Sequence, residues 1–374
     1  MLLNLIAQAL LVTNLAVAER FPPPDGPYNV GITQTIFNRS SPNDPVAPQN
    51  VSSLLLATIY YPTLSIPNPR TTAPYLDPII AQTWSGSRNL PDGTLDRLKT
   101  WNQVDAPFIP QFGNNTLLPT VIFSPGGGAN AAFYNALLSS LASHGYTVVA
   151  IDHPGEAPYL DFPLSSGLGG VYGVTSPWNR TFATTLYHMR VDDALATIRT
   201  LYPAYVKASN APFNTTHFLI LGHSLGGAAA AGAMSREPSI LGGVNLDGGF
   251  WDEDPDTQRP FLIISGEEHT PAYDPSLGPF SDAQTGWWRW LEVRGTDHLD
   301  FGDFGLWVDL FGGRGNTTMQ TLGEIWKPRC VRVVSELVLR FFGVVLGKEG
   351  DLVQFPNVEF PEVRYVNGSK KGLV

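Results

Sequence analysis

The chain has 374 residues, of which 43% are hydrophobic and only 15% charged, so it can bury a large core and is neither disordered nor fibrous. A formal net charge of −10 at pH 7 disfavours nucleic acid and anionic membrane surfaces as main partners, because the field of the protein repels both. Cys330 is the only cysteine, so no intramolecular disulfide can form and stability must come from the core.

Residues 1–18 form an apolar stretch that ends in Ala16-Val17-Ala18, the small-x-small pattern of a signal-peptide cleavage site. No Lys or Arg precedes the apolar run, and an apolar N-terminal helix is the alternative. We expect a signal peptide over 1–18, a secreted glycoprotein, and one catalytic domain over 19–374. No later apolar run is long enough to cross a membrane without charges. Seven sequons agree with secretion: Asn38, Asn50, Asn114, Asn179, Asn214, Asn316 and Asn367.

Residues 22–112 are rich in Pro, Asn and Thr and contain two strand-like segments, 28–37 and 52–61, which predict an antiparallel edge followed by long loops. From Pro119 onward, short β-branched runs alternate with helical stretches, the pattern of a parallel sheet covered by helices. The sequence therefore predicts an α/β protein with a mostly parallel central sheet, helices on both faces and an antiparallel N-terminal edge. The expected strands are 120–124, 146–151, 217–221, 243–246, 261–265 and 291–294, and the expected helices are 131–144, 188–201, 225–235 and 332–346.

One short motif, Gly222-His223-Ser224-Leu225-Gly226, lies between an expected buried strand and a helix of small residues. This is the setting of a nucleophile elbow, in which a strained serine projects above the sheet at a helix N-terminus. The alternative is a Gly-Ser turn whose serine is only structural. The flanking strand and helix favour Ser224 as a nucleophile, in the α/β-hydrolase fold.

A serine hydroxyl is a weak nucleophile, so the chain must also supply a base and an orienting acid, which follow the serine in this fold. His298 is the only histidine after the last expected strand, in a loop at the end where open α/β sheets place reactive groups. The other histidines are expected to be packing or surface residues: His144, His153, His188, His217, His223 and His269.

Two positions compete for the acid. Asp247 directly follows one expected strand, whereas Glu267 and Glu268 follow the next, where many α/β-hydrolases carry theirs. The acid must be partly buried and bonded to the imidazole to hold its tautomer. Glycines after Asp247 would allow a close approach, while the glutamate pair resembles a solvated loop, so we favour Asp247.

An oxyanion hole needs backbone N–H groups aimed at the developing negative charge. One is expected from Leu225, directly after the nucleophile. The other is expected from Gly127, because Pro125-Gly126-Gly127-Gly128 follows a buried strand like the glycine-rich loop of many esterases. A tight turn without this role is the alternative. No metal-ligand spacing is present, and no cofactor is expected.

Several segments resemble the platelet-activating factor acetylhydrolase family, of the plasma and type II intracellular kind, over most of residues 25–345. The interval from Ser224 to Asp247 is similar to the family's, so the resemblance also favours Asp247, and His298 and Gly127 fall on matching positions. The segments are Asp25-Gly-Pro-Tyr, Tyr60-Tyr-Pro, Phe123-Ser-Pro-Gly-Gly-Gly, Leu141-Ala-Ser-His-Gly-Tyr-Thr-Val-Val-Ala, Gly222-His-Ser-Leu-Gly-Gly, Leu246-Asp247, Arg294-Gly-Thr-Asp-His298 and Phe301-Gly-Asp-Phe304.

The resemblance implies calcium-independent hydrolysis of a short or oxidised acyl chain from the sn-2 position of a phospholipid. Pro125, Gly127 and Gly248-Gly249 depart from the family's usual residues toward a wider pocket. A broader carboxylesterase or polyester hydrolase is therefore the first alternative, and a catalytically silent binding module the second. The expected partner is a small-molecule or lipid ester. Trp287, Trp288 and Trp290 could meet a lipid surface or the acyl chain, but core packing is favoured.

Overall fold

A computed structural model describes residues 20–369 apart from 40–43, 49–50, 52–53, 89, 111–117, 175–178, 252–255, 312–321, 349–351 and 353–355. The expected signal peptide and three sequon asparagines, Asn50, Asn114 and Asn316, lie outside the described residues. Asn38, Asn179 and Asn367 are exposed and Asn214 is partly exposed.

The core of the molecule is a sheet in which eleven described strands follow the order β13-β12-β11-β10-β9-β5-β6-β2-β1-β4-β3. Neighbours from β6 to β12 pair in parallel, whereas β2 pairs antiparallel with both β6 and β1. This is the mostly parallel sheet with an antiparallel N-terminal edge that the sequence predicts. The strands are β1 (Asn29–Asn38), β2 (Leu54–Thr63), β3 (Thr72–Pro74), β4 (Lys99–Val104), β5 (Thr120–Ser124), β6 (Thr147–Asp152), β9 (Phe218–His223), β10 (Ile240–Leu246), β11 (Phe261–Gly266), β12 (Trp288–Val293) and β13 (Val363–Gly368), with β7 (Tyr159–Leu160) and β8 (Val171–Tyr172) in a separate hairpin.

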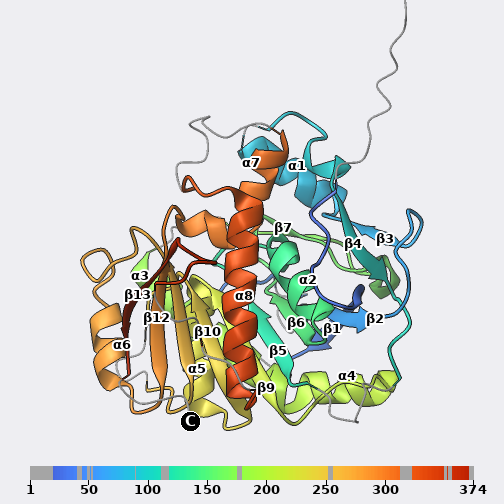
Figure 1. Cartoon of the computed structure of the whole chain (residues 1–374). Coiled ribbons are helices and arrows are strands. Elements are labelled where there is room, and N and C mark those ends of the chain that lie inside the picture. Colours follow the sequence, from blue (N-terminus) through green and yellow to red (C-terminus); the bar gives the residue numbers. More distant parts are fainter. Residues whose placement is uncertain are drawn as a thin grey trace, which may run out of the picture.

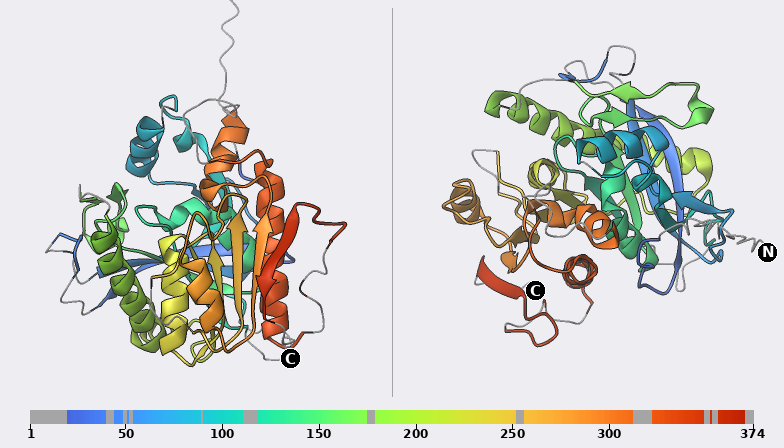
Figure 2. Two further views of the ribbon diagram at one scale, coloured as in Figure 1. Left: turned by 90° about the vertical axis from the view of Figure 1, so that its left-hand side faces the viewer. Right: turned by 90° about the horizontal axis from the view of Figure 1, so that it is seen from above.

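Helices cover both faces of the sheet (Figures 1 and 2). Alternate residues of a strand point to opposite faces, so Val121 and Phe123 of β5 join the core under α1, α2, α7 and α8, while Ile122 joins the core under α3, α4, α5 and α6. The helices are α1 (Pro78–Ser87), α2 (Asn135–Ser143), α3 (Arg180–Ala196), α4 (Tyr202–Ser209), α5 (Leu225–Arg236), α6 (Leu277–Ala283), α7 (Phe304–Phe311) and α8 (Lys327–Val345).

Four expected elements begin earlier than expected. β10 begins at Ile240 instead of residue 243, and β12 begins at Trp288 instead of 291. α8 begins at Lys327 instead of 332, and the helix expected over 188–201 already begins at Arg180. The shift in β12 places Trp288 and Trp290 on the strand itself. Both are buried, and the Trp290 Nε1–H donates to Ser265 Oγ at 2.8 Å. Trp287 is also buried and stacks on Phe341, so the core-packing interpretation of these tryptophans is confirmed.

Several short elements have no counterpart in the expected set, among them β3, β4, α1, α6, α7 and β13. They are short or carry no clear apolar period, so tertiary contacts decide them. Within the described part of the chain, none of the helices has the length and apolar character needed to cross a membrane.

Candidate active site

The elbow at Ser224 joins the end of β9 to the start of α5. Ser224 has φ 54° and ψ −123°, a strained conformation of the kind found at functional sites, and its amide donates to the Leu246 carbonyl at 2.8 Å. A Cβ on Gly222 would lie 2.1 Å from the Gly226 carbonyl oxygen, and one on Gly226 would lie 2.1 Å from that of Ser124. Only glycine fits at both positions, and this close packing lifts the serine above the carboxyl ends of the strands.

The structure brings Ser224, His298 and Asp247 into one chain of hydrogen bonds. His298 Nε2 lies 3.1 Å from Ser224 Oγ, and His298 Nδ1 lies 2.6 Å from Asp247 Oδ2. The carboxylate can only accept, so Nδ1 carries the proton and Nε2 is left to accept from the serine hydroxyl. The three residues follow β9, β10 and β12, whose carboxyl ends meet at the same edge of the sheet.

Asp247, and neither Glu267 nor Glu268, contacts His298. Asp247 is 4% exposed, has φ 53°, and its amide donates to the Ile264 carbonyl at 2.8 Å. Both glutamates are exposed, and Glu267 accepts from the Gly295 amide at 2.7 Å instead. A Cβ on Gly248 would come within 2.2 Å of the Ser224 carbonyl oxygen, which explains the glycine after the acid.

A second histidine, His269, binds the other oxygen of Asp247. His269 Nδ1 lies 2.9 Å from Asp247 Oδ1, and His269 Nε2 lies 3.2 Å from Asp274 Oδ2. Burial by itself lowers the pKa of His269, but the hydrogen bonds that His269 donates to Asp247 and Asp274 outweigh it and raise the pKa to about 9. Burial likewise opposes ionisation of Asp247, but hydrogen bonds from His269 and His298 hold its pKa well below the usual value. The imidazolium of His269 therefore keeps Asp247 ionised at neutral pH.

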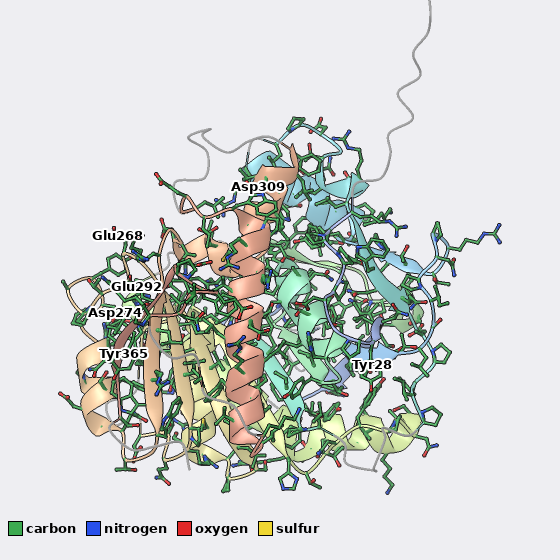
Figure 3. All side chains as sticks on the ribbon, viewed as in Figure 1. Tyr28, Glu268, Asp274, Glu292, Asp309 and Tyr365 are labelled. Atoms are coloured by element: carbon green, nitrogen blue, oxygen red, sulfur yellow. The ribbon has the colours of Figure 1, made fainter. Side chains whose placement is uncertain are left out.

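Gly127 and Leu225 line one cavity with Ser224. The cavity has a volume of about 560 Å³ and is also bounded by Arg180, Phe250 and Asp274, among other residues; Figure 3 labels Asp274, close to the strands in the left part of the view. Leu225 is the first residue of α5, so its amide has no acceptor within the helix. Among the described residues, no acceptor is found for the Gly127 amide.

Arg190 of α3 holds the loop that carries Gly127. Its guanidinium, 2% exposed, donates to the Pro125 carbonyl, to the Gly126 carbonyl at 3.3 Å and to Ser124 Oγ at 3.2 Å. The same group pairs with Glu156, with contacts of 3.1 and 2.5 Å. Bonding of the loop carbonyls to a rigid planar fork fixes the backbone that presents the Gly127 amide.

His223, buried under the site, connects the loop that carries Gly127 to the loop that carries His298. Burial lowers its pKa well below the usual value, so the ring is neutral. The His223 Nε2–H donates to the His298 carbonyl at 3.0 Å, and His223 Nδ1 accepts from the Tyr134 hydroxyl at 2.8 Å. The oxygen of this hydroxyl in turn accepts from the Gly126 amide at 2.9 Å. His223 is thus a buried packing residue, as expected, that also positions two loops.

The expectation that His269 is only a packing or surface residue is wrong, because its Nδ1 contacts Asp247 Oδ1. Arg190 and Tyr134 were not predicted as site residues. A usable signal existed for His269 and Arg190. His269 follows a strand at the reactive edge, with an aspartate five positions later. Arg190, like Asp193, is a charged residue among the apolar residues on the buried side of α3. No cluster of three or more His, Cys, Asp or Glu side chains that could hold a metal is found in the part of the chain that the structure describes.

Comparisons with known proteins agree with this architecture. The family model for the alpha/beta hydrolase family matches residues 121–341, and the model for platelet-activating factor acetylhydrolase, isoform II, matches residues 15–161. A probable 1-alkyl-2-acetylglycerophosphocholine esterase of Arthroderma benhamiae is 28% identical over 68% of this chain and 68% of the relative. A platelet-activating factor acetylhydrolase of Cavia porcellus is 24% identical over 94% of this chain and 83% of the relative.

Among solved structures, a ferulic acid esterase from Streptomyces cinnamoneus matches with a TM-score of 0.79 and 26% identity, covering 94% of this chain and all of the other. The family model, the relatives and the solved structure together identify the protein as a carboxylic ester hydrolase. The resemblance read from the motifs is confirmed: the chain belongs to the alpha/beta hydrolase family and, within it, resembles the platelet-activating factor acetylhydrolases.

Proposed function

We propose that this chain is a secreted serine esterase, one catalytic domain in the mature form, which removes short or oxidised sn-2 acyl groups from phospholipids. The observation that carries the proposal is the hydrogen-bonded chain Ser224–His298–Asp247, which opens onto a cavity lined by Gly127 and Leu225. A nucleophile, a base, an acid and two donors at one edge of the sheet are the parts that acyl transfer requires.

In the first half-reaction, Ser224 Oγ attacks the ester carbonyl while His298 Nε2 takes the hydroxyl proton. The carbonyl oxygen becomes negatively charged and is held by the Gly127 and Leu225 amides and the N-terminus of α5. Asp247 stabilises the imidazolium, which then gives its proton to the departing alcohol and leaves an acyl serine. Water gives a proton to His298 Nε2 and attacks the acyl serine. The bond to Ser224 Oγ then breaks, His298 returns the proton to that oxygen, and the acid leaves.

His269 and Arg190 act as positioning residues in this scheme. The charged His269 keeps Asp247 ionised and fixes its second oxygen, so the first oxygen meets His298 in a single geometry. Arg190 anchors the carbonyls of the oxyanion loop, and the amide of Gly127 therefore needs little reorganisation when charge develops.

The cavity supports a phospholipid ester. Phe250, Trp251 and Leu225 offer an apolar wall for an acyl chain, and Arg180 is the only cation among the described residues that line it. A single exposed guanidinium near the nucleophile fits a phosphate better than it fits a neutral ester. The names of the two relatives from Arthroderma benhamiae and Cavia porcellus point to the same substrate class.

Secretion is supported by the apolar segment 1–18 and by exposed sequon asparagines at positions 38, 179 and 367. A broader carboxylesterase or polyester hydrolase is the second candidate. It is favoured by the ferulic acid esterase, whose fold covers 94% of this chain.

The decisive experiment compares the wild type with Ser224→Ala on a series of phospholipids of increasing sn-2 acyl length, with p-nitrophenyl acetate as a common ester. We expect Ser224→Ala to lose turnover by roughly five orders of magnitude while keeping its circular dichroism spectrum. The matched control is Ser281→Ala, on α6 and outside the cavity. Retained turnover in Ser224→Ala would refute the mechanism. Faster cleavage of polyester film than of acetyl-phospholipid would instead favour the second candidate.

A further inference from the structure

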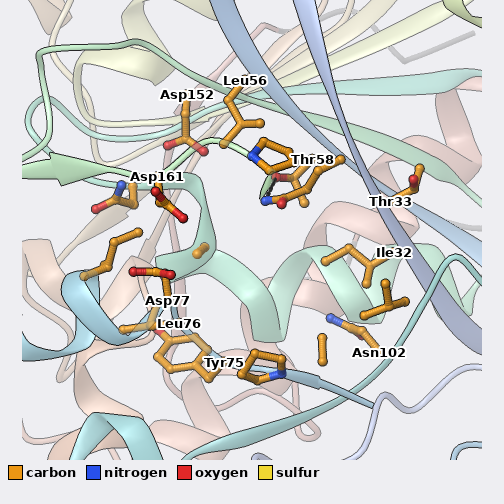
Figure 4. A pocket seen from close by; sticks show the side chains of 18 of the residues that line it. Ile32, Thr33, Leu56, Thr58, Tyr75, Leu76, Asp77, Asn102, Asp152 and Asp161 are labelled. Atoms are coloured by element: carbon orange, nitrogen blue, oxygen red, sulfur yellow. Dashed lines mark hydrogen bonds between the residues drawn. The ribbon is translucent and has the colours of Figure 1, made fainter. Parts of the chain in front are cut away.

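A second cavity, of about 400 Å³, lies beside the antiparallel strands and shares no lining residue with the cavity of Ser224 (Figure 4). Its walls come from β1 to β4, the start of α1, the segment between β5 and α2, the last residue of β6, and the end of β7 with the residues after it. It therefore lies partly at the carboxyl ends of parallel strands, where open α/β sheets bind their ligands. The proposed esterase mechanism uses none of its residues.

The lining is strongly acidic. Asp77, Asp105, Asp152 and Asp161 all contribute, and the described residues around the cavity include no lysine, arginine or histidine. None of the ion pairs found among the described residues involves Asp77, Asp152 or Asp161. Because no cation lines the cavity, its ionised carboxylates leave a negative potential that a ligand can neutralise.

Two of these carboxyl groups have raised pKa values, and burial is the main cause in both. Burial raises the pKa of Asp152 to about 7, although its Oδ1 accepts from the Ala131 amide at 2.7 Å and Arg190 acts in the opposite direction. Burial and the neighbouring charge of Asp77 also raise the pKa of Asp161. Asp77 caps α1, with Oδ1 accepting from the Ile79 amide at 2.8 Å.

Two fully buried amide side chains supply an independent sign of a ligand. Asn130 is 1% exposed and its Oδ1 has no hydrogen-bond partner, while Asn102 is 0% exposed and its Nδ2 has none, counted among the described residues. Their other ends are held: Asn130 Nδ2 donates to the Tyr159 carbonyl at 3.0 Å, and Asn102 Oδ1 accepts from Ser139 Oγ at 2.9 Å. Both residues line the cavity, and Figure 4 shows the Asn102 amide turned toward it.

An unpaired buried amide atom costs about 1–3 kcal/mol, so two of them at one cavity favour a guest that offers both a donor and an acceptor. The aromatic side chains of Tyr60, Tyr75 and Phe162 add apolar and π surface to the walls. Such a lining suits an organic cation better than a hydrated metal ion, which needs three or more close oxygen ligands. Among the described residues no group of three carboxylate or histidine side chains could hold a metal.

We propose that this cavity binds a small organic ammonium ion that carries a hydroxyl group, an amino alcohol. The ammonium group lies against Asp161 and Asp77, and the hydroxyl exchanges hydrogen bonds with Asn102 and Asn130. The volume of the cavity falls in the range of small-molecule sites. The proposal is independent of the esterase reaction, because the two cavities are lined by different residues.

The test is isothermal titration calorimetry of the full chain carrying Ser224→Ala, so that no turnover adds heat. The probe is choline chloride, and the neutral probe is 3,3-dimethyl-1-butanol, which has the same shape without the charge. We expect saturable binding of choline with one site per chain and at least roughly ten-fold weaker binding of the neutral probe. Absence of saturable choline binding, or equal binding of both probes, would overturn the proposal.

Asp161→Asn, placed on the Ser224→Ala background, should weaken choline binding roughly ten-fold or more, because it removes a charge of the cavity and keeps its shape. Asp282→Asn on the same background is the matched control. It changes the net charge equally from an exposed position on α6 and should leave choline binding unchanged. Equal effects of the two substitutions would mean a nonspecific charge effect and would also overturn the proposal.

Turnover measurements keep the test interpretable. With Ser224 intact, Asp161→Asn should retain wild-type turnover of p-nitrophenyl acetate, which shows that the variant is folded. Choline should not compete with this substrate in the wild type. Competitive inhibition would place choline in the cavity of Ser224 and would contradict the proposal. The proposal would also be contradicted if calcium chloride gave binding heat and its binding prevented that of choline, because the site would then belong to a metal.

Discussion

Replacing His269 by asparagine tests how the protein keeps Asp247 ionised. Asparagine can still donate one hydrogen bond toward Asp247 Oδ1, but it carries no charge and loses the contact with Asp274. In the wild type the pKa of His269 rises from an ordinary value of 6.5 to about 9. With the side chain only 9% exposed, this change corresponds to about 3 kcal/mol of folding free energy.

The sign of the effect follows from linkage. Because the pKa is higher in the folded state, this stabilisation is complete below about pH 6.5 and is lost as the pH rises through about 9. The wild type should therefore be more stable than His269→Asn at low pH. The difference between their free energies of unfolding should be about 3 kcal/mol larger near pH 6 than near pH 10. The contact with Asp274 belongs to this pH-dependent difference, because it is one of the causes that raise the pKa of His269.

Urea unfolding at a series of pH values measures this difference, and His217→Asn, on the exposed histidine before β9, is the matched control. The control curve should run parallel to the wild-type curve. Turnover of p-nitrophenyl acetate by His269→Asn should fall roughly ten-fold in kcat with little change in KM, because a positioning residue acts on the transition state. A stability difference between wild type and His269→Asn that does not vary with pH would refute a charged His269.

Other predictions follow from the loops and glycines of the site. Arg190→Lys should lower kcat about a hundred-fold, since an ammonium cannot replace the planar fork on the oxyanion loop, whereas Arg199→Lys, at an exposed ion pair, should change neither kcat nor melting temperature measurably. Tyr134→Phe should lower kcat roughly ten-fold at unchanged KM, because the hydroxyl between the Gly126 amide and His223 is lost; wild-type kcat would contradict this. Gly222→Ala should cost more than about 3 kcal/mol in urea unfolding because its Cβ would overlap the Gly226 carbonyl, whereas Gly86→Ala, with nothing within 4 Å, should gain about 0.5–1 kcal/mol.

Local signals were enough for the framework of the fold. Thr120–Ser124 of β5 coincides with the expected strand, and α5 ends one residue from its expected end, because a buried parallel strand is a continuous apolar run and a helix of small residues follows the elbow at once. The elements that were missed, such as β4 and β13, lie toward the edges of the sheet, where one side faces solvent and the apolar pattern is weak.

The order of motifs along the chain was also enough to nominate Ser224 and His298, because the α/β-hydrolase fold constrains which residue types follow which strands. For the acid, the order of motifs left Asp247 and Glu267 in competition, since both follow parallel strands whose carboxyl ends meet at one edge. The structure separates them by burial and by contact: Asp247 is enclosed and bonded to His298, whereas Glu267 is exposed.

The contacts of His269 and Arg190 and the acidic second cavity are seen only in the tertiary structure. Arg190 lies 64 positions from Gly126 in the sequence, and the carboxylates of Asp77, Asp152 and Asp161 come from three separate segments. Neither a helix period nor a strand alternation records which distant side chains meet. The sequence by itself nominated Ser224 as the nucleophile, because the elbow motif and the strand and helix that flank it are close together in the chain. Which charges are buried and which are paired was decided by packing, because the cost of burying a charge depends on what the folded chain places beside it.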